Sequence, residues 1–114
     1  MPQAASHFEV GTETATGRGW HYEVTLTTAQ GVGTQHAVTL CWHDHDYWCG
    51  GAIAPSRLVE RLLALLAQHL GKGHTPATLP PRFDCATARR WLPEIDDWLR
   101  EGSGVLGGPC DLSQ

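Results

Sequence analysis

Several features that mark large classes of protein are missing from this sequence of 114 residues. Its first residues, MPQAASHFEV, have neither the basic start nor the apolar run of a secretory signal. The longest apolar-rich stretch, residues 58–70, contains charged side chains and is too short to span a bilayer. We therefore expect a soluble, cytoplasmic protein that has no membrane partner.

Positive charge is also scarce. The chain has 8 Lys and Arg residues against 12 Asp and Glu residues, and Arg18 is the single Lys or Arg in residues 1–54. The sequence therefore offers no basic stripe that could follow a phosphate backbone, and we expect no nucleic-acid partner.

The spacing of the cysteines excludes the usual zinc motifs. C-x2-C and H-x3-H pairs are both absent, although the chain contains four cysteines and seven histidines. Without export, the cysteines are expected to be reduced thiols or metal ligands rather than disulfides. The four thiols are Cys41, Cys49, Cys85 and Cys110.

Alternating apolar residues in the first half predict a small antiparallel sheet. Trp20–Thr28 alternates strictly between apolar and polar side chains, and Thr34–Trp42 repeats the pattern after a glycine-containing loop. A further strand is expected over Phe8–Thr14. We therefore predict a β-hairpin that a third strand extends, with strands between residues 7 and 46.

Helical patterns dominate the second half. Pro55 suits a first helical turn, Gly71 suits the position just past a helix end, and a broad leucine stripe lies between them. A second helix is expected over residues 85–101, with Asp84 as its N-cap and Pro93 either kinking or splitting it. The predicted fold is a single α+β domain over residues 1–101, with the helices packed on one sheet face. Residues 102–114 are predicted to be a flexible tail.

The segment LCWHDHDYWCGG, residues 40–51, concentrates the side chains that could carry chemistry. If the strand continues through it, alternate residues from Cys41 onward share one face, and Cys49 can fold back as a further ligand. Thiolate and imidazole together favour zinc over magnesium or calcium. This hypothesis predicts the ligands Cys41, His43, His45 and Cys49, with Asp44 and Asp46 orienting the imidazoles.

A different interpretation makes the same segment a contact surface. Its histidines and aspartates then lie at an exposed strand end, while its cysteines are packed as small apolar side chains. So many leucines on one helix need a large partner surface, and a small sheet leaves exposed edges, which together suggest a homodimer. The predicted partner surface comprises Trp42, Tyr47, Trp48, Leu62 and Leu66.

A third interpretation places a reactive thiol at Cys49, with His45 lowering its pKa and the following glycines admitting a substrate. No orienting residue completes a catalytic set, so the sequence favours a protein without enzymatic activity. The main prediction is a small protein-interaction or assembly module, without a cofactor. Zinc binding and a cysteine-dependent enzyme are the alternatives.

Overall fold

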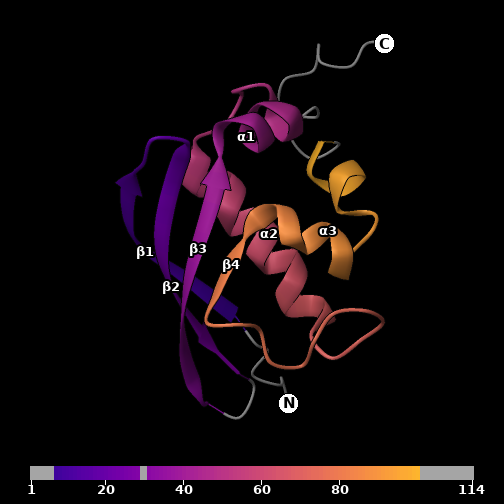
Figure 1. Ribbon diagram of the computed structural model, residues 1–114. Helices are drawn as coiled ribbons and strands as arrows, with labels where there is room; N and C mark the ends of the chain where they lie inside the picture. Colours follow the sequence, from indigo (N-terminus) through magenta and orange to yellow (C-terminus); the bar gives the residue numbers. More distant parts are fainter. Residues whose placement is uncertain (1–6, 29–30, 101–114) are drawn as a thin grey trace.

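The computed structural model describes residues 7–28 and 31–100, and its sheet begins with three antiparallel strands. These are β1 (His7–Ala15), β2 (Gly19–Thr27) and β3 (Gly33–Cys41), in the positions that alternation predicts. A short fourth strand, β4 (Arg82–Asp84), completes a sheet of order β1-β2-β3-β4. The α+β prediction is confirmed, with one strand more than expected (Figure 1).

Alternation in β2 and β3 separates a buried sheet face from an open one. Tyr22 and Val24 are fully buried, whereas His21 and Glu23 point to the other side. Tyr22 lies opposite Val38 in the antiparallel register, so apolar residues of both strands meet on the same face. The opposite face stays polar, as is usual for an antiparallel sheet covered on one side.

β1 forms the outer edge of the sheet and is interrupted by an irregularity in its register between Val10 and Glu13. The shift brings Glu13 opposite Tyr22, whose hydroxyl donates a 2.8 Å hydrogen bond to Oε1 of Glu13. Burial raises the pKa of Tyr22 well above its ordinary value, and the Glu13 carboxylate raises it further. The buried hydroxyl thus has a partner at the sheet edge.

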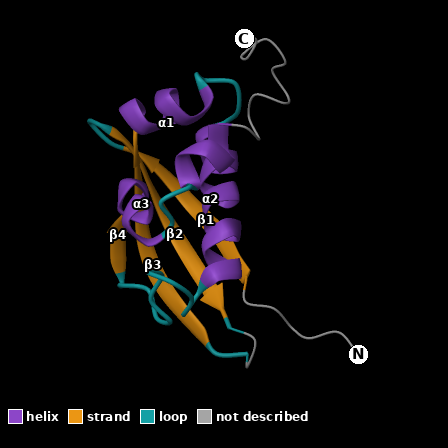
Figure 2. Ribbon diagram, turned by 90° about the vertical axis from the view of Figure 1, so that its right-hand side faces the viewer, coloured by secondary structure: helices purple, strands orange, loops and turns teal. Residues whose placement is uncertain are grey.

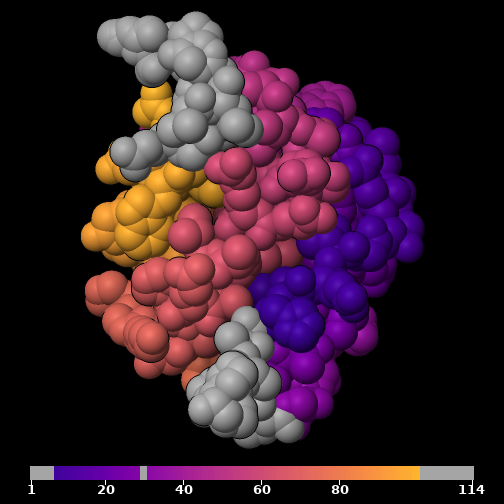
Figure 3. Space-filling model, turned by 180° about the vertical axis from the view of Figure 1, so that it is seen from behind, coloured from indigo at the N-terminus to yellow at the C-terminus, as the bar shows by residue number. Residues whose placement is uncertain are grey.

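The leucine-rich helix α2 (Pro55–His69) covers the apolar face of the sheet. Pro55 opens the helix, and Gly71 follows its end with φ of +75°, as predicted. Figure 2 shows the helices gathered on one side of the sheet, and Figure 3 shows α2 from behind, between β1 and the C-terminal helical segment. The buried side chains of α2 are Leu58, Val59, Leu62, Leu63 and Leu66.

β4 runs parallel to β3 and was not predicted. Phe83 pairs with Val38, and Nδ1 of the buried His36 lies 2.7 Å from the carbonyl oxygen of Pro80, just before the strand. Three residues after a pair of prolines are too few to show a period, so their pairing is set by contacts with distant β3 rather than by local pattern.

The predicted helix over 85–101 is divided. A 3-10 turn, η1 (Cys85–Thr87), leads into α3 (Ala88–Trp91), and residues 95–100 form a separate helical turn. Leu92 leaves the helical conformation at φ of −130°, because the residue before a proline is pushed away from it. Asp84 does cap the first turn, accepting a 2.9 Å hydrogen bond from the Ala86 backbone N–H.

One hydrophobic core joins the sheet to all the helical segments, so the described residues form a single compact domain. None of the helices in residues 7–28 and 31–100 is long and apolar enough to cross a membrane. The tail predicted over residues 102–114 lies outside the described residues.

Candidate functional site

The segment after β3 is a helix, α1 (Trp42–Cys49), and the prediction of a continued strand is wrong. The Trp42 backbone N–H donates to the Arg18 carbonyl oxygen at 2.8 Å, which is where the chain turns out of the sheet. Gly50 ends the helix in the left-handed conformation at φ of +59°. The buried positions, Asp44, Trp48 and Cys49, follow a helical period rather than alternation.

Because the segment is helical, the metal ligands expected at residues 41–49 do not point toward a common site. His43 is exposed, as is the predicted orienting residue Asp46. Nε2 of His45 lies 2.8 Å from the Ile53 carbonyl oxygen, and the Cys49 thiol is 3.3 Å from the His45 carbonyl oxygen. The predicted four-residue site therefore does not form, because side chains two apart no longer share a face on a helix.

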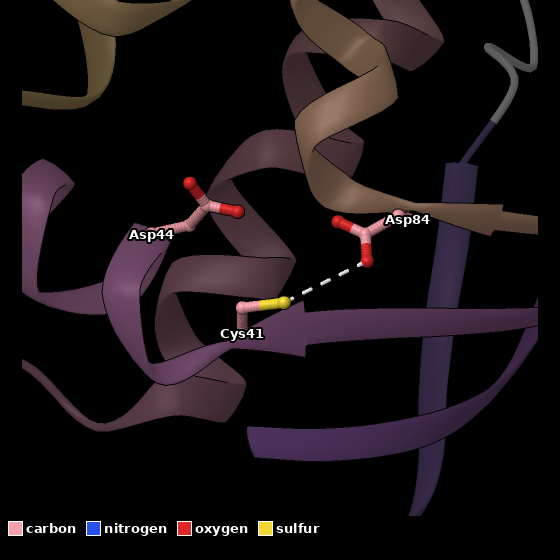
Figure 4. A group of neighbouring side chains, drawn as sticks. All are labelled: Cys41, Asp44 and Asp84. Carbon is pink, nitrogen blue, oxygen red and sulfur yellow. Dashed lines mark hydrogen bonds between the residues drawn. The ribbon is translucent and has the colours of Figure 1, made fainter. Parts of the chain in front are cut away.

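A different set of ligand-type side chains does converge, and we call it the thiol–carboxylate group: Cys41, Asp44 and Asp84 (Figure 4). These residues come from the end of β3, the first turn of α1 and β4, and one donor atom from each lies within 4.8 Å of the others. The Cys41 Sγ is 3.9 Å from Oδ2 of Asp84. No other such group occurs in residues 7–28 and 31–100.

Electrostatics keep the thiol of this group protonated. Burial raises the pKa of Cys41 above its ordinary value of 9.0, and the carboxylates of Asp84 and Asp44 raise it further, while Arg18 acts in the opposite direction. A thiol at this position is a poor nucleophile at neutral pH. A divalent cation would reverse the balance, because a coordinated thiol loses its proton.

Arg89 connects the thiol–carboxylate group to the core. Its Nη2 lies 3.2 Å from Oδ1 of Asp44, and its Nε donates to Oδ1 of Asp96 at 2.8 Å. The Trp48 indole N–H donates to the same Asp96 oxygen at 2.6 Å. We call this set the Arg89 network: Asp44, Trp48, Arg89 and Asp96.

The guanidinium of Arg89 also faces two aromatic rings. Its Cζ is 4.7 Å from the ring centroid of Trp48 and 5.6 Å from that of Tyr47. The Arg100 Cζ lies 5.0 Å from the Tyr47 centroid. Cation–π attraction of this kind helps to hold the rings of Tyr47 and Trp48 in place.

Two large aromatic side chains of α1 remain exposed, and we call them the aromatic surface: Trp42 at 55% and Tyr47 at 44% exposure. The other three residues of the predicted partner surface are buried, so a partner could not contact them. Trp48, expected to be exposed, is 1% exposed beneath Arg89, and Leu62 and Leu66 are completely buried under the sheet.

The cysteine-dependent alternative also lacks its expected geometry. Cys49 is 6% exposed, and its thiol contacts backbone carbonyl oxygens rather than an imidazole. The ring of His45 is engaged by Ile53 and packs edge-on against Trp20 at 5.2 Å. Neither a nucleophile–base pair nor an open thiol is formed at this point.

The open face of the sheet carries a hollow of about 550 Å³ over β2, β3 and β4. Its floor includes the small side chain of Ala37, which faces Glu23 on one neighbouring strand and Arg82 on the other. His21 and Glu23 form a surface pair at 3.3 Å. The charges around the hollow are of both signs, so they select no single class of ligand.

Sequence reasoning missed the partners that matter most around α1. Arg89 and Asp96 fit an ordinary surface helix in the sequence, and Asp84 was recognised only as a cap. Their contacts with Cys41, Asp44 and Trp48 span 43 to 48 residues of chain, so no local pattern could have indicated them. Comparison of the chain with family models, curated proteins and solved structures finds no match.

Proposed function

We propose that the protein is a small interaction module that contacts a protein partner through the aromatic surface of α1. The observation that supports this proposal is the exposure of Trp42 and Tyr47 on one eight-residue helix. Tryptophan and tyrosine are enriched among residues that dominate binding energies, since each buries a large area with few rotatable bonds.

The Arg89 network gives this surface a fixed base. Trp48 is buried on the packed side of α1 and donates a hydrogen bond to Asp96. The ion pair between Arg89 and Asp44 connects the helix to the segment after β4. A surface that is already ordered loses little conformational entropy on binding, which favours affinity.

A second copy of the chain remains one candidate partner, although the structure removes one argument for it. The leucine stripe of α2 is buried in the chain's own core, so it needs no partner helix. The free edge of β1 has a register irregularity and the exposed acids Glu9 and Glu13, features that discourage edge-to-edge pairing. Self-association would therefore use the aromatic surface.

The test compares Trp42→Ala/Tyr47→Ala with Val32→Ala as a matched control. Val32 is 58% exposed in the loop between β2 and β3, so the control removes an exposed apolar side chain elsewhere. We expect the double variant to fold normally and to lose the partners that co-purify with the wild type. If the wild type self-associates, the double variant should sediment as a monomer. Equal recovery by all three proteins would contradict the proposal.

Zinc binding at the thiol–carboxylate group is the second candidate function. The supporting observation is the convergence of one sulfur and two carboxylate donors from three separate elements. Thiolate and carboxylate oxygen are both established zinc ligands, and a solvent molecule could complete a four-coordinate shell.

A chelator-competition titration tests the zinc proposal. We expect one zinc ion per chain, lost in Cys41→Ser and retained in Cys49→Ala, whose thiol lies outside the group. Absence of zinc from the wild type, or equal binding by Cys41→Ser, would contradict it.

A further inference from the structure

We infer that the guanidinium of Arg89 competes with a metal ion for Asp44 and thereby regulates the thiol–carboxylate group. This inference rests on the proposed zinc site. It concerns a residue outside the three ligand-type side chains, and it links that site to the aromatic surface.

Asp44 is the side chain over which the competition takes place. It is only 6% exposed, and Oδ1 accepts from Arg89 Nη2 at 3.2 Å. A buried carboxylate requires a counter-charge, and in the described residues Arg89 is the cation within ion-pair distance of it. Zinc would supply the same compensation at the same carboxylate.

The two cations cannot both lie close to Asp44 without repelling each other. Donor atoms of the group lie within 4.8 Å of one another, so an ion between them would be near the guanidinium. Like charges at such separations interact strongly where water is largely excluded. Arg89 therefore lowers the affinity for zinc, and zinc weakens the contact between Arg89 and Asp44.

Arg89 has a second ion-pair partner, Asp96, which it can keep when it leaves Asp44. Its Nε remains bonded to Asp96 at 2.8 Å, and the Trp48 ring lies beneath it. The same guanidinium faces Tyr47, so its movement would reach the exposed part of α1. Zinc occupancy and the aromatic surface are thus coupled through one side chain, and such coupling is reciprocal.

The test measures zinc affinity by competition with a chromogenic chelator at constant pH, in the wild type and in Arg89→Gln. Arg57→Gln serves as the control, because Arg57 is an exposed arginine of α2 that pairs with Glu60 at 3.7 Å. We expect Arg89→Gln to bind zinc on the order of 10-fold more tightly, within the usual range of coupling between sites, and the control to match the wild type.

A second variant, Arg89→Lys, keeps the test usable if Arg89→Gln does not fold. Arg89→Lys retains the charge but lacks the planar fork that reaches Asp44 and Asp96 together, so a smaller gain of about threefold is expected. Circular dichroism and melting temperature establish which variants are folded before affinities are compared.

The outcomes separate this inference from the zinc proposal. Unchanged zinc binding in folded Arg89 variants, with the wild-type site intact, would overturn the competition. Weaker binding would also overturn it and would show that Arg89 orients Asp44 instead. Zinc binding by the variants but not by the wild type would support competition at Asp44 but contradict the zinc proposal for the wild-type protein. Zinc binding by none of the proteins would overturn both proposals.

Discussion

Gly19 determines how closely β2 can approach β3 beside Cys41. A Cβ at this position would overlap the Leu40 carbonyl oxygen and lie 2.8 Å from the Cys41 Cα. Both obstacles are backbone atoms within the sheet, which cannot rotate away as a side chain could. Glycine is therefore required here by close approach between two strands.

Gly19→Ala is predicted to lower the free energy of unfolding by about 3 kcal/mol, because one strand must shift to relieve the overlap. Gly17→Ala is the matched control, since a Cβ at Gly17 meets nothing within 4 Å. Urea denaturation measures both. Equal stabilities of the two variants would show that the strands are not in this close contact.

Alkylation of Cys41 is predicted to be slow at neutral pH. Burial and the neighbouring Asp84 and Asp44 raise the pKa of this thiol above 9.0, and the thiolate is the reactive form. Asp84→Asn removes one negative charge and should move the rise in rate to lower pH. Iodoacetamide labelling from pH 7 to 10, read for each cysteine by peptide mass spectrometry, tests this prediction. If Cys41 were alkylated at pH 7 as fast as an exposed, unperturbed cysteine, the prediction would be refuted.

At the scale of elements, α1 has a packed side and an exposed side, and a tryptophan marks each. Trp48 is 1% exposed and donates to Asp96, whereas Trp42 is 55% exposed. The two residues therefore have different roles despite their proximity in the sequence.

Trp48→Ala is predicted to destabilise the protein by about 3–5 kcal/mol through the cavity and the lost bond to Asp96. Trp42→Ala is expected to change stability by less than about 0.5 kcal/mol, as is usual for an exposed position. Thermal and denaturant unfolding of the two variants, side by side, measure the difference. A large loss in Trp42→Ala would mean that this ring is part of the core.

The elements that sequence reasoning predicted well are those with a long local period. β2 and β3 alternate over nine residues each, and α2 has a continuous apolar stripe bounded by Pro55 and Gly71. In contrast, WHDHDYWC has no apolar alternation of its own and suggests a strand only as a continuation of the one before it. Its helical form depends on the turn at Arg18 and on Gly50. β4 has three residues, and its position is set by β3.

At the scale of the molecule, the candidate site is assembled from distant parts of the chain. The sequence draws attention to Cys41 and Asp44, because they lie in a segment dense in polar and aromatic residues. It could not indicate that Asp84 and Arg89, 40 or more residues away, complete their surroundings. Such contacts arise from packing α1 and the segment after β4 against the same sheet.

The whole fold is predicted to weaken in alkaline solution. Burial raises the pKa values of Tyr22, Cys41 and Cys85 above their ordinary values of 10.0, 9.0 and 9.0. Nearby carboxylates raise them further: Glu13 acts on Tyr22, and Asp84 and Asp44 act on the two cysteines. The folded state then retains protons that the unfolded chain releases, so stability is lost as pH rises above about 9. Melting temperatures from pH 7 to 10.5 should fall above pH 9, and less steeply in Cys85→Ala. A flat profile would contradict the burial of these groups.

Site-specific photo-cross-linking tests the proposed interaction surface most directly. A benzophenone amino acid would replace Trp42, Tyr47 or, as a control, Val32, and the protein would be irradiated in the cells that produce it. The proposal predicts the same discrete protein partner from positions 42 and 47, and none from position 32. No cross-link from either position of α1, or the same products from position 32, would contradict the role of the aromatic surface.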